Sequence, residues 1–158
     1  MPKTQNKINP DITVPNRDTS LLAPWLAVKA QDAIDHCNEA GYPIAMFEGH
    51  RSTARQEFLF AQGRTRPGKK ITYAKPWESF HNYGLALDPV FFDGRKWSWE
   101  GPWDKVHAIF HEHGFETLDF EKSHVEITGG MKHQEAYLLF KEQGMQAVWD
   151  AVLKRLSF

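Results

Sequence analysis

Ser79-Phe-His-Asn-Tyr-Gly-Leu-Ala-Leu-Asp88 is the stretch from which the organisation of this chain can be worked out. It places the imidazole of His81 seven residues before the carboxylate of Asp88. Gly84 can adopt backbone angles that other residues resist, so the chain can turn sharply after His81. The apolar run 85–87 then predicts a buried strand that carries Asp88 at or near its end.

A second cluster, Glu121-Lys-Ser-His124, lies downstream. Residues three apart on a flat strand face opposite ways, so Glu121 and His124 can share a site only if the backbone bends between them. From His124 onward, the alternation His-Val-Glu-Ile predicts a half-buried strand. The two clusters together offer two histidines, one aspartate and one spare glutamate, which is the inventory of a catalytic zinc site with three ligands, a water position and a general base.

Composition limits the class of protein. The 158 residues are enough for one domain with a hydrophobic core, and 41% hydrophobic and 13% aromatic residues are typical of a globular chain. The net charge of −1 gives no electrostatic reason to expect nucleic acid as a partner. The single cysteine, Cys37, excludes an internal disulfide and is expected to be a small core residue.

The first 20 residues contain no secretory signal, and no run is long enough for insertion in a membrane. We therefore expect a chain that is made in the cytoplasm, and we expect a monomer.

Three further histidines need a separate explanation. His107 and His111 lie one helical turn apart and could chelate a metal, but His111-Glu-His113 is not the His-Glu-x-x-His of zincins. Exposed helix histidines are the favoured interpretation.

The remaining pattern predicts an α+β fold. Helices are expected at 20–40, from Thr53 towards Gly63, from Pro102 towards Gly114, and at 131–143 and 145–156. Strands are expected at 44–48, 96–99 and 115–118 and around the two clusters, with 71–73 extended and a hairpin at Asp93-Gly94. Pro89 cannot donate a ladder hydrogen bond, which favours a strand margin or edge.

The domain division that follows is an extended segment at 1–19, a catalytic core at 20–130 and a helical segment at 131–158 that packs on the core.

The spacing Ser-x-His-x-x-Gly-x-Ala-x-Asp, followed later by Glu-x-x-His, resembles a known family. This is the VanY-like family of zinc D-alanyl-D-alanine carboxypeptidases and L-alanyl-D-glutamate peptidases, which cut peptidoglycan stem peptides. The runs Glu48-Gly-His-Arg-Ser-Thr-Ala-Arg-Gln56 and Ala61-Gln-Gly-Arg-Thr-Arg-Pro-Gly68 are similar to the L-alanyl-D-glutamate branch, which includes phage endolysins. The resemblance also implies the mainly antiparallel orientation of the small sheet.

The resemblance implies roles for particular residues. It implies a zinc ion held by His81, Asp88 and His124, with Glu121 as the catalytic base and Arg51 as a substrate or oxyanion contact. Without the resemblance, the favoured interpretation of Arg51 is a surface arginine near a helix cap. Ser79 and Gln56 are the predicted substrate-binding residues.

The sequence also departs from the family. Ser123 replaces the aromatic residue that many relatives have before the histidine, and 115–120 replaces a Trp- and Gly-rich run.

Three functions remain open at this point. The first is a zinc metallopeptidase that hydrolyses the L-alanyl-D-glutamate bond, as a bacteriolytic endolysin or a wall-remodelling enzyme, with the stem peptide as its partner. The alternative is a D-alanyl-D-alanine carboxypeptidase or dipeptidase with the same zinc site. A non-enzymatic zinc domain is the third, and the presence of Glu121 argues against it because binding alone needs no base. A lysin made without a signal peptide would reach the wall after phage-type release.

Overall fold

The protein was analysed as a computed structural model that describes residues 12–156. The first eleven residues of the predicted segment 1–19 therefore lie outside the described part. The helices are η1 (Thr19–Leu21), α1 (Pro24–Glu39), α2 (Thr53–Ala61), η2 (Phe80–Tyr83), α3 (Trp103–Glu112), α4 (His133–Gln143) and α5 (Met145–Leu156). The strands are β1 (Ile44–Glu48), β2 (Ala86–Phe92), β3 (Trp97–Ser98), β4 (Glu116–Leu118) and β5 (Glu121–Glu126).

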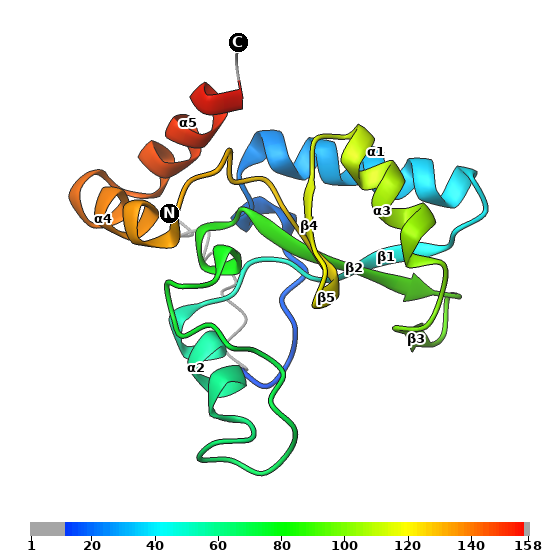
Figure 1. Ribbon diagram of the computed structural model, residues 1–158, viewed down its shortest axis with the longest axis horizontal. Helices are drawn as coiled ribbons and strands as arrows, with labels where there is room; N and C mark the ends of the chain where they lie inside the picture. The colour runs from blue at the N-terminus through cyan, green and yellow to red at the C-terminus, as the bar shows by residue number, and fades with distance from the viewer. Residues whose placement is uncertain (1–11, 157–158) are drawn as a thin grey trace, which may run out of the picture.

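The strands form one antiparallel sheet in the order β1-β2-β5-β4, with β3 paired to the far end of β2. Helices α1 and α3 lie on one face of the sheet, while α2 and the long loop that follows it lie on the other side (Figure 1). Helices α4 and α5 form a separate pair at one end of the sheet. The predicted α+β fold with a small antiparallel sheet is confirmed.

Strand β2 contributes to both the hydrophobic core and a polar centre, because its successive side chains point to opposite faces of the sheet. Leu87 and Phe91 belong to the hydrophobic core, together with Val125 of β5 and Phe110 of α3. Asp88 points to the opposite face. The same central strand therefore contributes one face to the core and one face to a polar centre.

Two irregularities in the sheet determine which residues reach the polar face. Strand β1 pairs Met46 with Pro89 but Glu48 with Asp88, so one extra residue turns Glu48 towards the side of Asp88. Strand β5 has a larger irregularity, because Thr117 pairs with Val125 whereas its neighbour Leu118 already pairs with Glu121. The bend that the sequence required between Glu121 and His124 is this bulge.

Several local predictions differ from the structure. Pro89 is inside β2 rather than at its margin, but it has the predicted edge character, because only β1 pairs with β2 at this residue. Helix α2 begins at Thr53 as predicted but ends at Ala61, and Ser52 caps it, because its hydroxyl accepts from the N–H of Arg55. The first predicted helix is divided into η1 and α1, with Pro24 as the first residue of α1.

The C-terminal helices are attached to the rest of the chain by apolar and polar contacts. Val148 and Val152 are fully buried in the common core. The indole N–H of Trp149 donates to the carbonyl of Tyr83, 2.6 Å away. Within residues 12–156, no helix combines the length and the apolar character that crossing a membrane would require.

Gly84 offers a test of how η2 is held. Its φ is +66°, and a Cβ added there would lie 2.6 Å from the carbonyl oxygen of Leu21. Gly94 also has a positive φ, +95°, but an added Cβ would meet nothing within 4 Å. We expect Gly94→Ala to cost about 1 kcal/mol of stability from backbone strain alone. Gly84→Ala should cost about 3 kcal/mol or more, because the clash adds to the strain.

Urea denaturation of both variants measures the difference. Equal losses in the two variants would show that the close approach to Leu21 is not required.

Candidate metal centre and active site

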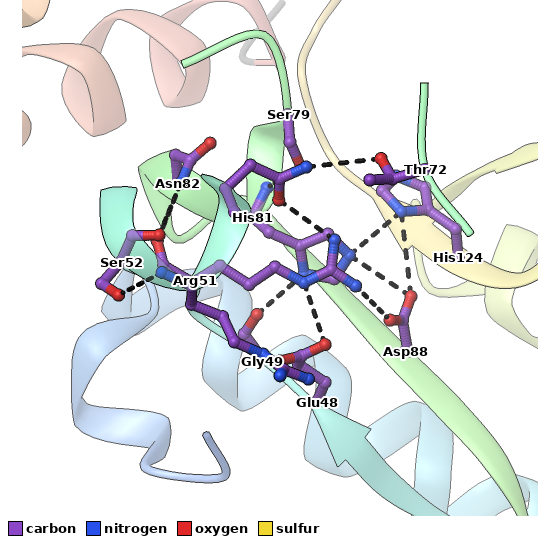
Figure 2. A network of polar contacts seen from close by, with 12 residues as sticks. Glu48, Gly49, Arg51, Ser52, Thr72, Ser79, His81, Asn82, Asp88 and His124 are labelled. Atoms are coloured by element: carbon purple, nitrogen blue, oxygen red, sulfur yellow. Dashed lines mark hydrogen bonds and ion pairs between the residues drawn. The ribbon is translucent and has the colours of Figure 1, made fainter. Parts of the chain in front are cut away.

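The structure brings His81, Asp88 and His124 together in a buried cluster (Figure 2). The Nε2 atom of His81 lies 3.3 Å from Oδ1 of Asp88 and 3.2 Å from Nδ1 of His124. The third distance, from His124 Nδ1 to Asp88 Oδ1, is 3.8 Å. Three potential ligand atoms from η2, β2 and β5 therefore face one point.

The remaining ring nitrogens show which atoms are available for a metal. His81 Nδ1 lies 2.7 Å from the carbonyl oxygen of Gly49, which can only accept, so Nδ1 carries the hydrogen. His124 Nε2 lies 2.5 Å from the carboxylate of Glu126 and donates to it in the same way. Each neutral ring is thereby left with a lone pair on the nitrogen that faces the cluster. This is the arrangement typical of metal-binding histidines.

The spacing of the three atoms fits zinc. Bonds of about 2.0–2.1 Å in a tetrahedron place neighbouring ligand atoms about 3.3–3.4 Å apart. Two of the three distances, 3.2 and 3.3 Å, are close to that value, and the third is 3.8 Å. Two imidazoles and one carboxylate also form a common donor set for a catalytic zinc with an open position. The chain thus has a candidate site for a divalent metal.

Asp88 is held by a network of buried charges. Its second oxygen, Oδ2, accepts from Nη2 of Arg51 at 3.2 Å. Arg51 also donates from Nε to Glu48, and the other oxygen of Glu48 accepts from Arg55, both at 2.9 Å. Burial alone raises the pKa of Asp88, but the neighbouring His81 and Arg51 outweigh that effect and hold the pKa well below its usual range. Asp88 is therefore a carboxylate at neutral pH.

The pKa of His124 is shifted upward, in the opposite direction to that of Asp88. Burial lowers the pKa of its imidazole, but the hydrogen bond to Glu126 and the nearby Asp88 raise the pKa by more, so that the net shift is upward. A metal at this site therefore competes with a proton for Nδ1 of His124.

Glu121 lies beside the ligands at the mouth of the cluster. Its Oε2 is 3.7 Å from His124 Nδ1, and its side chain is 34% exposed. The bulge in β5 brings this side chain to the face of His124 although the two residues are three apart. A carboxylate in this position can reach a water molecule next to the metal site.

Arg51 reaches the cleft, but its main contacts are with other protein groups. Each of its three nitrogens has a partner, on Glu48, Gln56 and Asp88. The structure therefore shows it as a support for Asp88, and direct contact with substrate stays a prediction.

The two predicted substrate-binding residues have different surroundings. Ser79 caps η2 by accepting from the N–H of His81, and its side chain also lines the cleft. Gln56 is completely buried and donates to Thr72 and to the carbonyl of Ala74. The side chain braces the loop that forms one wall of the cleft, and its contact with substrate stays a prediction.

The histidines of α3 are not part of this centre. His107 Nε2 contacts the carbonyl of Lys122 at 2.6 Å, and His111 Nε2 contacts the hydroxyl of Thr117 at 2.9 Å. His113 lies 3.0 Å from His36 instead. These contacts connect α3 and α1 to their neighbours. They support the interpretation that these residues are ordinary helix histidines and not a second metal site.

The metal centre lies between two arms of a cleft, whose shared wall includes Arg51, Glu121 and Phe120. One arm, of about 450 Å³, we call the tryptophan arm; it is lined by Phe47, Leu59, Ile71, Trp99, Trp103 and Lys122. The other, of about 390 Å³, we call the serine arm; it is lined by Tyr73, Glu78, Ser79, Phe80 and His133. An extended chain can therefore lie across the metal centre with one end in each arm.

Two important residues were not found from the sequence. Glu126 could have been found, because residues two apart on the strand after His124 share a face. Glu48 could not, because the β1 bulge that turns it towards Asp88 has no simple signature in the sequence.

Comparison with known proteins assigns the class. The sequence model of the VanY family, described as D-alanyl-D-alanine carboxypeptidase, matches residues 19–134. The chain belongs to this family of peptidases. The match includes His81, Asp88, Glu121 and His124.

Individual relatives and solved structures resemble this chain over different lengths. A stretch of 48 residues is 50% identical to the peptidoglycan L-alanyl-D-glutamate endopeptidase CwlK of Bacillus subtilis, covering 30% of this chain and 29% of that protein. The L,D-carboxypeptidase DacB of Streptococcus pneumoniae has a similar structure, with a TM-score of 0.55 and 21% identity over 81% of this chain and 76% of DacB. The structure of the LdcB LD-carboxypeptidase is also similar, with a TM-score of 0.51 and 18% identity over 85% of this chain and 68% of LdcB. The two structures support the fold.

Metal content tests the ligand set. We expect purified protein to bind about one zinc per chain, and His81→Ala and His124→Ala each to lose most of it because only two ligands remain. His111→Ala is the matched control, since its imidazole bonds to Thr117 and should leave the zinc content unchanged. Elemental analysis after dialysis gives the ratios. Full zinc retention in both ligand variants would refute the assignment.

Proposed function

We propose that this chain is a zinc-dependent peptidase that hydrolyses the L-alanyl-D-glutamate bond of peptidoglycan stem peptides. The observation that carries the proposal is the buried cluster of His81, Asp88 and His124, with the carboxylate of Glu121 at its mouth. Family membership supports peptidase chemistry, and the similarity to CwlK supports this particular bond. Endolysin activity and release through a phage-type lesion stay predictions from the resemblance.

Each residue of the candidate active site has a separate role in the proposed hydrolysis. A zinc ion held by the three ligands would lower the pKa of a bound water to about 7 and polarise the scissile carbonyl. Glu121 accepts the proton of the attacking water and returns it to the leaving amine. Arg51 fixes Asp88 and keeps it ionised, and Glu126 fixes the ring of His124. The two arms of the cleft orient the peptide on either side of the metal centre.

Glu121→Gln separates the base from the ligands. The variant keeps the shape of the side chain but cannot accept the proton, so we expect the hydrolysis rate to fall by about 10²–10⁴-fold. Zinc content should remain near wild type because the three ligands are unchanged, and stability should change little. Rates on a stem peptide and elemental analysis provide the two readouts.

Two results would contradict this role. Near-normal turnover would mean that another carboxylate is the base, and loss of zinc would mean that Glu121 is itself a ligand.

A second candidate is supported by a specific observation. The family description names D-alanyl-D-alanine carboxypeptidases. Such enzymes remove a C-terminal D-alanine and could use the same zinc site.

Product analysis decides between the two candidates. Digestion of purified peptidoglycan should create new N-terminal D-glutamate or D-isoglutamine residues, which mass spectrometry identifies after amine labelling. Glu121→Gln protein is the control for background hydrolysis. Release of D-alanine as the sole product would make the carboxypeptidase the correct assignment.

A further inference from the structure

A second groove opens on the surface beside the metal cleft, between the loop before η2 and helix α4. It has a volume of about 610 Å³. Its apolar floor includes Trp77, Tyr137 and Leu138, and its polar rim includes Glu78, His133 and Lys141. We call it the aromatic groove.

The floor of the aromatic groove consists of packed rings and is partly open to solvent. The Trp77 ring stacks on Phe140 with ring centres 4.6 Å apart, and on Tyr137 at 5.9 Å. Leu138 is 59% exposed and Tyr137 is 38% exposed. An apolar surface made by Leu138 and the edge of a stack of aromatic rings is thus exposed to solvent, with the ammonium of Lys141 over the Tyr137 ring.

The backbone at Trp77 is strained in a way that keeps this surface in place. Trp77 has φ +70° and is the only residue other than glycine between 12 and 156 with a positive φ. Its N–H donates to the side chain of Asn82 at 2.9 Å, and its carbonyl accepts from the hydroxyl of Tyr83 at 2.8 Å. Such strain persists where surrounding contacts hold it, and it is concentrated at functional sites.

The aromatic groove continues into the cleft. Glu78 and His133 line both the groove and the serine arm, and the serine arm ends at His81 and His124. A ligand that lies across the metal centre can therefore extend into the aromatic groove without leaving the surface.

We propose that the aromatic groove binds the amino-sugar ring of the peptidoglycan glycan strand. A pyranose has an apolar face of C–H groups that fits a flat aromatic floor, and equatorial hydroxyl and amide groups that suit a polar rim. The inference rests on the proposed function. In peptidoglycan, L-alanine is joined directly to the lactyl group of muramic acid.

The position of the groove agrees with the proposed bond. With the L-alanyl-D-glutamate bond at the metal, a single residue, roughly 3.5 Å of extended chain, and the lactyl group separate the metal from the sugar. With a D-alanyl-D-alanine bond at the metal, four residues, roughly 14 Å of extended chain, would intervene. The proposed bond therefore requires a sugar site that adjoins the metal cleft, as the aromatic groove does through Glu78 and His133.

Two substrates that differ only in the sugar test the inference. N-acetylmuramyl-L-alanyl-D-isoglutamine carries the ring, and N-lactoyl-L-alanyl-D-isoglutamine lacks it. We expect the wild-type zinc protein to prefer the first by about tenfold in kcat/KM, mostly through KM. Tyr137→Ala and, separately, Leu138→Ala should lower kcat/KM for the substrate with the sugar and leave kcat/KM for the other substrate unchanged. The two kcat/KM values should then agree within about twofold. Val28→Ala, a 62% exposed site on α1, is the control and should leave the ratio unchanged.

A second measurement does not depend on catalysis. Chelator-treated protein should bind chitotetraose, which has no peptide, and the indole N–H signal of Trp77 should shift in the NMR spectrum. Tyr137→Ala should weaken this binding, while thermal melting confirms that the variant is folded.

The outcomes separate this inference from the proposed function. Chitotetraose binding without hydrolysis of either substrate would support the groove and refute the proposed function. Equal cleavage of the two substrates by wild type, with no chitotetraose binding, would overturn the inference and leave the proposed function intact. An equal loss of kcat/KM on both substrates in Tyr137→Ala would also overturn the inference, because the surface would then support the fold. A change in self-association in Leu138→Ala would overturn it as well, because the surface would then bind a second copy of the chain.

Discussion

The structure depends most on the contact between Asp88 and Arg51. Asp88 is buried in the central strand, where an ionised carboxylate is tolerated only if both of its oxygens have partners. One oxygen faces the two imidazoles of the metal centre, and the other accepts from Arg51. Arg51 is itself aligned by Glu48, which also binds Arg55. The position of the metal is therefore fixed by the sheet and by a chain of ion pairs that extends into α2.

The two strand irregularities serve this arrangement in different ways. The extra residue in β1 turns Glu48 to the polar face, where it can hold both arginines. The bulge in β5 places Glu121 and His124 on one face while Val125 remains in the core. Catalytic positions are thus obtained by local departures from regular pairing, and the rest of the sheet keeps its hydrophobic alternation.

The spacing of residues in the sequence predicted much of the site because it depends on short-range geometry. His81 and Asp88 are separated by one turn and one strand, and the alternation after His124 indicated which side chains share a face. The burial of Gln56 could not be predicted, because it depends on the loop 72–74 that packs over this side chain. Glu48 and the aromatic groove could not be predicted, since the first needs a bulge and the second needs α4 to pack on Trp77.

The charges of the metal centre have a consequence for the stability of the whole chain. Four carboxylates, from Glu48, Asp88, Glu121 and Glu126, gather around two guanidinium groups, from Arg51 and Arg55. The carboxylates thus outnumber the guanidinium groups by two, and one divalent cation carries two positive charges. Occupancy and folding are therefore thermodynamically linked, because the unfolded chain does not assemble this set of charges and the folded chain does. A divalent cation bound by His81, Asp88 and His124 would therefore act as a counterion for these carboxylates in addition to its role in hydrolysis.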